Sequence, residues 1–132
     1  MHQLFTIGYG GRSPQQVAAL LKEHGVKVLI DLRETPRTRV PGFSKSALES
    51  YMMSQEIIYR HLQALGNANH RIPDAPVKVV DEGLGMQALC DVLTQYEVAI
   101  MCACRHHGRC HRSYISERLL EAVPELVIRH IP

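Results

Sequence analysis

Short apolar runs alternate with amphipathic stretches along most of the chain. The runs are rich in β-branched residues and predict five buried strands, at 4–7, 26–32, 57–62, 97–102 and 126–131. Between the runs, apolar residues recur at spacings of three and four and predict helices, as at Met86, Leu89, Cys90 and Leu93. This alternation predicts a Rossmann-like fold of the α/β class, a three-layer αβα sandwich with a mainly parallel sheet of about five strands.

Capping signals indicate where two of the helices begin. Ser13 is followed by proline and then by Gln16, which predicts a capped helix that ends near Gly25. Ser46 and Glu49 have the spacing of a second capping box and predict the start of another helix.

Proline and glycine residues, which interrupt helices and strands, define the remaining segments. A helix is predicted from Ser113 to the residue before Pro124. The stretch 33–42 holds two prolines and a glycine and predicts a loop, whereas the stretch 66–81, rich in Gly, Asn and Pro, predicts a longer surface excursion.

Bulk composition sets the class of the protein. With 132 residues, of which 45% are hydrophobic, residues 1–132 should form a single domain around one core. The formal net charge of +2 is too small to indicate a nucleic-acid coat. The chain has no basic leader and no apolar run near the roughly 18 residues of a membrane span, so we expect a cytoplasmic protein with no membrane partner and with reduced cysteines.

Arginine is concentrated at two places that should share one edge of the sheet. Six of the eleven arginines fall in 33–39 and 105–112, each directly after a predicted strand. Because ligands of such sheets bind at the carboxyl ends of the strands, we expect an anion site there, and phosphate suits it. The expected anion-binding residues are Arg33, Arg39, Arg109 and Arg112, with the turn Gly8, Tyr9 and Gly10. The alternative is that these arginines are solvated or paired with nearby carboxylates.

The cysteine-rich segment 102–112 supports three chemistries. Cys110, next to His111 and Arg112 and before a helix, could be an activated nucleophile. The stretch 104–109 resembles the six-residue cysteine loop of rhodaneses, which implies sulfur transfer or thiol redox chemistry at Cys104. A zinc site would use Cys102, Cys104, Cys110 and His111, but the spacing is not that of common zinc sites, so no metal is expected.

Three residues of the expected site could have supporting roles. Asp31 ends a strand and is expected to orient Arg33 or His111 in preference to acting as a general base. His111 could equally bind a backbone carbonyl or carry out acid–base work. Cys102 could be a small buried hydrophobe at a strand end.

Several motifs together resemble the domain of unknown function 488 family. They are the segments 6–10, 28–33, 58–59, 65–66, 101–103 and 110–112, with Pro36, Arg39 and Phe43. The resemblance covers almost the whole chain and implies the same α/β fold, but no reaction. The signature positions that it marks are Asp31, Arg33, Arg39, Cys102, Cys110, His111 and Arg112. Cys104 stands where many relatives have an acidic residue, which favours thiol chemistry here.

Three functional hypotheses follow. The first is an enzyme that acts on a small phosphate-bearing molecule, such as a nucleotide or a nucleic-acid end, with Cys110 or His111 performing the chemistry. The second is a binding module that uses the same cleft without turnover and associates with nucleotides or nucleic acid. The third is sulfur transfer or redox chemistry through Cys104. None of them calls for a cofactor.

Overall fold

The computed structural model describes residues 2–36, 38–69, 71–72, 74–104 and 111–132. Strands and helices alternate through these ranges, as the sequence predicts. In chain order they are β1 (Leu4–Gly8), α1 (Pro14–Glu23), β2 (Val28–Asp31), α2 (Lys45–Ser54), β3 (Ile58–His61), the 3-10 turn η1 (Gln63–Leu65), α3 (Glu82–Leu93), β4 (Val98–Cys102), α4 (His111–Ala122) and β5 (Ile128–His130).

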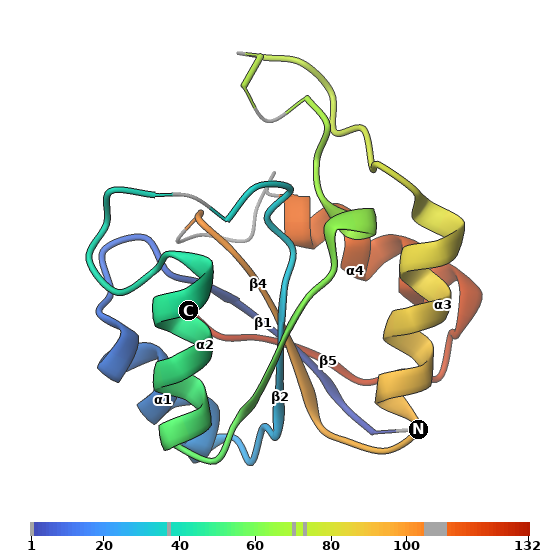
Figure 1. Cartoon of the computed structure of the whole chain (residues 1–132). Coiled ribbons are helices and arrows are strands. Elements are labelled where there is room, and N and C mark those ends of the chain that lie inside the picture. Colours follow the sequence, from blue (N-terminus) through green and yellow to red (C-terminus); the bar gives the residue numbers. More distant parts are fainter. Residues whose placement is uncertain (1, 37, 70, 73, 105–110) are drawn as a thin grey trace.

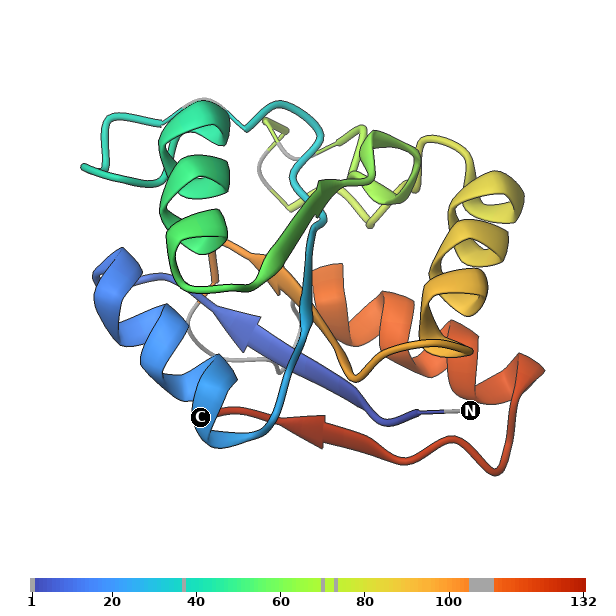
Figure 2. The same cartoon turned by 60° about the horizontal axis from the view of Figure 1, so that its bottom comes forward.

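The strands form one sheet in the order β3-β2-β4-β1-β5, and every pair of neighbours is parallel. Helices α1 and α2 cover one face of this sheet, and α3 and α4 cover the other (Figures 1 and 2). The predicted three-layer αβα sandwich is therefore confirmed.

Two apolar cores lie on opposite faces because side chains alternate along each strand. In β2, Leu29 packs with α1 and α2, whereas Val28 and Ile30 pack with α3 and α4. Asp31 follows the same alternation and shares the face of Leu29. All four residues of β2 are buried, as is expected of a strand covered by helices on both sides.

The helix boundaries confirm one predicted cap. The Ser13 hydroxyl accepts a hydrogen bond from the Gln16 amide at 3.1 Å, and the Gln16 side-chain oxygen accepts one from the Ser13 amide at 2.8 Å. After α1, Gly25 adopts a φ of +73°, which explains a glycine at that stop.

Two other predicted helix starts were wrong. Helix α2 begins at Lys45 after Ser44, so Ser46 lies inside its first turn and cannot cap it. Helix α4 includes His111, two residues before the predicted start at Ser113. The helix predicted from the spacing of Met86 and Leu89 is α3, which begins at Glu82, where the Asp81 side chain accepts from the amide of Leu84 at 3.2 Å.

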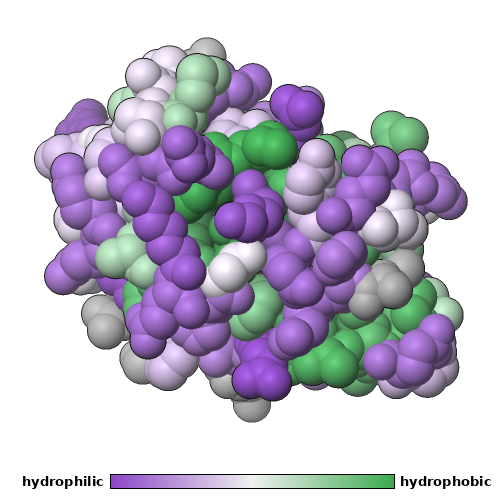
Figure 3. Space-filling model, turned by 90° about the horizontal axis from the view of Figure 1, so that it is seen from below, coloured by the Kyte–Doolittle hydropathy of each residue, from purple (hydrophilic) through white to green (hydrophobic). Residues whose placement is uncertain are grey.

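The two edges of the sheet differ in what covers them. The excursion between η1 and α3 rises above the carboxyl edge (Figure 1). The opposite edge, seen from below, carries mainly polar side chains with apolar patches between them (Figure 3). Within the described ranges, no helix combines the length and the apolar character that crossing a membrane requires.

Candidate functional site

The strand order creates a crevice at the carboxyl edge of the sheet. After β1 and β2 the chain turns into α1 and α2 on one face, whereas after β4, which lies between these strands, it reaches α4 on the other. Neighbouring chain segments therefore diverge at the ends of these three strands. This is the place where open α/β sheets bind their ligands.

A cavity of about 730 Å³ occupies this crevice. Tyr9 after β1, residues from 32–38 after β2, and Cys102–Cys104 after β4 contribute to its lining, together with His111 at the start of α4. A further wall comes from the excursion between η1 and α3, through residues from 67–77. Segments that are distant in the sequence thus meet at one cavity.

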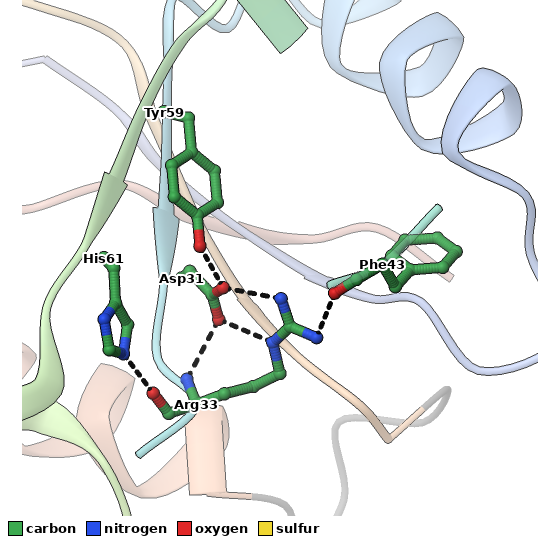
Figure 4. Close-up of polar contacts among 5 residues, drawn as sticks. All are labelled: Asp31, Arg33, Phe43, Tyr59 and His61. Atoms are coloured by element: carbon green, nitrogen blue, oxygen red, sulfur yellow. Dashed lines mark hydrogen bonds and ion pairs between the residues drawn. The ribbon is translucent and has the colours of Figure 1, made fainter. Parts of the chain in front are cut away.

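Asp31 and Arg33 form a buried ion pair beside the cavity. The Arg33 Nε donates to Asp31 Oδ1 at 2.9 Å, and Arg33 Nη2 donates to Asp31 Oδ2 at 2.7 Å (Figure 4). The backbone amide of Arg33 also donates to Asp31 Oδ1, at 3.0 Å. The Asp31 side chain is fully buried and that of Arg33 is 9% exposed. Asp31 therefore orients Arg33, one of the two roles expected for it.

Tyr59 on β3 supplies a further donor to this carboxylate. Its hydroxyl donates to Asp31 Oδ2 at 2.5 Å, and both residues project from the same face of the sheet (Figure 4). Burial and the neighbouring Asp31 charge raise the pKa of Tyr59 well above its ordinary value. Burial alone would lower the pKa of Arg33, but the hydrogen bond and charge of Asp31 outweigh it and raise that pKa.

The remaining contacts of Arg33 fix its guanidinium in place. Nη1 donates to the carbonyl oxygen of Phe43 at 2.6 Å, and the guanidinium carbon lies 5.2 Å from the centre of the Tyr9 ring. The Tyr9 and Phe43 rings stack, with centroids 4.3 Å apart. A guanidinium has five N–H donors, and three of those of Arg33 bond to Asp31 and Phe43.

Two histidines at this edge bind backbone carbonyls. His61 Nε2 lies 2.5 Å from the carbonyl oxygen of Arg33, and His111 Nε2 lies 2.5 Å from that of Leu65. Since a carbonyl only accepts hydrogen bonds, each Nε2 carries the proton. His111 thus ties the start of α4 to the end of η1, which is the tethering role that the sequence left open.

Arg112 lies beneath the cavity. It is fully buried, and its Nη1 donates to Cys102 Sγ at 3.2 Å and to the carbonyl oxygen of Cys104. Gly8 makes room for this arrangement, because a Cβ there would lie 2.6 Å from Arg112 Nη1 and 1.4 Å from the Cys104 oxygen. The absence of a side chain at Gly8 therefore lets the guanidinium approach the end of β4.

The structure brings five of the expected site residues together at the cavity. Its lining includes Tyr9, Arg33, Cys102, Cys104 and His111. Cys102 is buried, as a small hydrophobe at a strand end would be, whereas Cys104 is exposed.

Other expected residues do not reach the lining formed by the described residues. Arg39 is exposed on the surface, and Arg112 is buried below the cavity. Gly8 and Gly10 contribute backbone contacts instead, such as the bond from the Gly10 amide to the Ala103 carbonyl at 2.9 Å. Arg109 and Cys110 lie outside the described residues.

Sequence reasoning missed two parts of the site. Tyr59 shares the face of Asp31 through its register opposite Leu29, and the sequence alone does not give this register. The wall formed by residues such as Asn69, Arg71 and Ile72 had no signal either, since the excursion has no periodicity.

The described residues include no group of three or more His, Cys, Asp or Glu side chains arranged to hold a metal ion. The zinc hypothesis considered from the sequence also needs Cys110, which lies beyond the described ranges.

Fold and site together define an α/β protein with a parallel sheet and a cavity at the carboxyl edge. The chain belongs to the family described as Domain of unknown function DUF488, whose family model matches residues 13–119. The matched range holds the Asp31–Arg33 pair and the start of α4. No curated protein matches the chain.

Proposed function

We propose that this protein binds a small phosphate-bearing molecule in the carboxyl-edge cavity, with Arg33 as the principal anion ligand. The fixed Arg33 guanidinium carries the proposal: Asp31 and Phe43 hold this residue of the cavity lining in place. A guanidinium is a planar fork of N–H donors, which suits a phosphate or carboxylate group. Because these contacts already fix the side chain, little conformational entropy is lost on binding.

The other charged residues of the lining indicate a ligand with more than an anionic group. Arg71 adds a second guanidinium, while Glu34 and Asp74 add carboxylates. Carboxylates accept hydrogen bonds from hydroxyl or amino groups, so the lining favours a molecule that carries both a phosphate and such donors. A volume of about 730 Å³ lies within the usual range for small-molecule sites.

Chemistry on this ligand would fall to Cys104 and His111, which line the cavity, or to Cys110, which precedes His111 in the sequence. A protein that binds the ligand in the same cavity without converting it would be a binding module. Replacing Cys104 distinguishes the two: Cys104→Ser should abolish turnover and preserve binding in an enzyme that uses this residue.

Calorimetric titration with ribose 5-phosphate tests the proposal. Arg71 is exposed, so Arg71→Ala should leave the fold intact and weaken binding about tenfold through loss of one charge-assisted hydrogen bond. Arg129→Ala, an exposed arginine on β5, is the matched control and should bind like the natural protein. No binding at millimolar concentration, or equal loss in both variants, would exclude a phosphate site here.

Thiol chemistry is the second candidate, and the contact between Cys102 and Arg112 favours it. The cavity lining includes Cys102, and a buried guanidinium lies 3.2 Å from its sulfur. A cation at this distance stabilises a thiolate. The sequence pointed to Cys104 for this role, whereas the geometry favours Cys102.

Alkylation measures this reactivity directly. The Cys102 thiolate would attack the CH₂ group of iodoacetamide, forming an S–C bond as the C–I bond breaks and iodide leaves. Mass spectrometry of the native protein should then find Cys102 labelled faster than Cys90, a partly buried helix cysteine whose pKa burial raises. If Cys102 is labelled only after unfolding, thiol chemistry at this residue is ruled out.

A further inference from the structure

The described residues of the excursion, 66–69, 71–72 and 74–80, which we call the arm, contribute a separate wall of the cavity. Two backbone hydrogen bonds close its base. The amide of Ala68 donates to the carbonyl oxygen of Lys78 at 2.7 Å, and the amide of Val80 donates to that of Gly66 at 3.0 Å. Asn67 reinforces the base, because its Oδ1 accepts from the amide of Lys78 at 3.0 Å. The arm thus leaves η1 and returns to α3 as a closed loop above the sheet (Figure 1).

The arm presents a different chemistry from the opposite wall. Ile72, Ala75 and Val77 line the cavity from this side. Ile72 is 58% exposed, so a large part of this apolar lining residue is uncovered. A ligand that covers Ile72 would remove apolar surface from water.

An amide stands among these apolar side chains. Asn69 lines the cavity, and its Nδ2 donates to the Pro76 carbonyl at 3.0 Å, which orients the side chain. The amide oxygen has no hydrogen-bond donor among the described residues, so it can accept from a ligand. An apolar surface with one oriented acceptor suits a planar heterocycle that carries an amino group.

We propose that the arm binds the base of a nucleotide whose phosphate lies at Arg33. This inference rests on the proposed function and names its substrate class: nucleotides in preference to simple sugar phosphates. The phosphate of the nucleotide contacts the wall that contains Arg33, and its base packs against the wall that contains Ile72. The ribose between them has the hydroxyl donors that suit Glu34 and Asp74.

Calorimetry with AMP, adenosine and ribose 5-phosphate tests the two walls separately. AMP should bind at least about tenfold more tightly than ribose 5-phosphate, because only AMP covers the apolar side of the arm. Ile72→Ser should remove most of this preference and leave the affinity for ribose 5-phosphate unchanged. Val80→Ser is the matched control, since Val80 is an exposed apolar residue of the same arm that lies outside the described cavity lining.

The outcomes separate this inference from the function on which it rests. Equal affinity for AMP and ribose 5-phosphate would overturn the base site and preserve the phosphate site. Adenosine binding as tightly as AMP would preserve the base site and overturn the phosphate site, and binding of none of the three would overturn both. A 5′-phosphorylated oligonucleotide titrated in parallel identifies the source: tighter binding than AMP indicates a nucleic-acid end, and weaker binding indicates a free nucleotide.

Discussion

The hydroxyl of Tyr59 lies 2.5 Å from Oδ2 of Asp31, in a part of the sheet where the Asp31 side chain is fully buried. Tyr59 is therefore more than a core aromatic residue: it supplies a hydrogen bond to a carboxylate that water cannot reach. The Asp31–Arg33 pair depends on this third residue.

We predict that Tyr59→Phe destabilises the protein by about 1.5–3 kcal/mol, the usual contribution of a hydrogen bond to a charged group. Urea unfolding at neutral pH measures the change. Tyr51→Phe is the control, because the Tyr51 hydroxyl has no hydrogen bond to a described residue, and it should change stability much less. Equal losses in both variants would contradict the role of the Asp31 bond.

The same bond gives an alkaline pH dependence. Because the pKa of Tyr59 is raised in the folded protein, the unfolded chain loses this proton first as the pH rises above 10. Stability should therefore fall above pH 10, and the fall should be smaller in Tyr59→Phe than in Tyr51→Phe. Urea unfolding between pH 9 and 11 measures both slopes, and identical slopes would refute the assignment.

Removing the cation of the buried pair should cost more. Arg33→Met would leave Asp31 charged and without its main partner, and breaking a buried pair in this way costs about 3–5 kcal/mol. Arg118→Met removes the partner of Glu82 on the surface and should have a far smaller effect, since the Arg118 side chain is 45% exposed. Similar unfolding midpoints for both variants would show that the buried pair is not structural.

Gly8 and Gly83 form a matched pair for substitution by alanine. A Cβ at Gly8 would overlap the Cys104 carbonyl, which is backbone and cannot rotate away, so Gly8→Ala should destabilise by about 1–3 kcal/mol or more. A Cβ at Gly83 meets open space within helix α3, so Gly83→Ala should be neutral or stabilising by up to about 1 kcal/mol. Thermal unfolding followed by circular dichroism should show opposite shifts, and a neutral Gly8→Ala would disprove the close approach.

Glu82 should affect how the stability of the fold changes at acid pH. Its carboxylate accepts hydrogen bonds from Arg118 at 2.8 Å and Tyr114 at 2.9 Å, and these lower the pKa of Glu82 below its ordinary value. A lowered pKa stabilises the fold above the unfolded value, and this stabilisation is lost as the pH falls through the folded value. Glu82→Gln should therefore flatten the loss of stability below about pH 4.5, compared with Glu117→Gln on the exposed surface of α4. Unfolding curves between pH 3 and 7 that coincide for both variants would contradict this.

The fold was predictable because the local signals agree with the global arrangement. The buried run that contains β2 and the cap at Ser13 each follow from short windows of sequence, and both are confirmed. The sheet order was not readable, because β4 lies between β1 and β2 through contacts of high sequence separation. Pattern rules describe neighbours along the chain and contain no such information.

The site was predictable in location and less so in detail. Parallel topology alone gathers Tyr9, Arg33 and Cys104 at one edge. The burial of Arg112 was not predictable, because it depends on the space left by Gly8 on another strand. Ile72 and the rest of the arm were missed because an irregular segment carries no period from which a facing direction can be inferred.

The position of β1 affects how the chain can fold during synthesis. Residues 4–8 leave the ribosome before the other four described strands, yet their partners are residues 98–102 on one side and 128–130 on the other. Until those segments emerge, β1 has neither neighbour, whereas β2 and β3 can already pair with each other. Strand β4 therefore joins β1 to the β2–β3 pair only late in synthesis, and β5 adds the last edge after it.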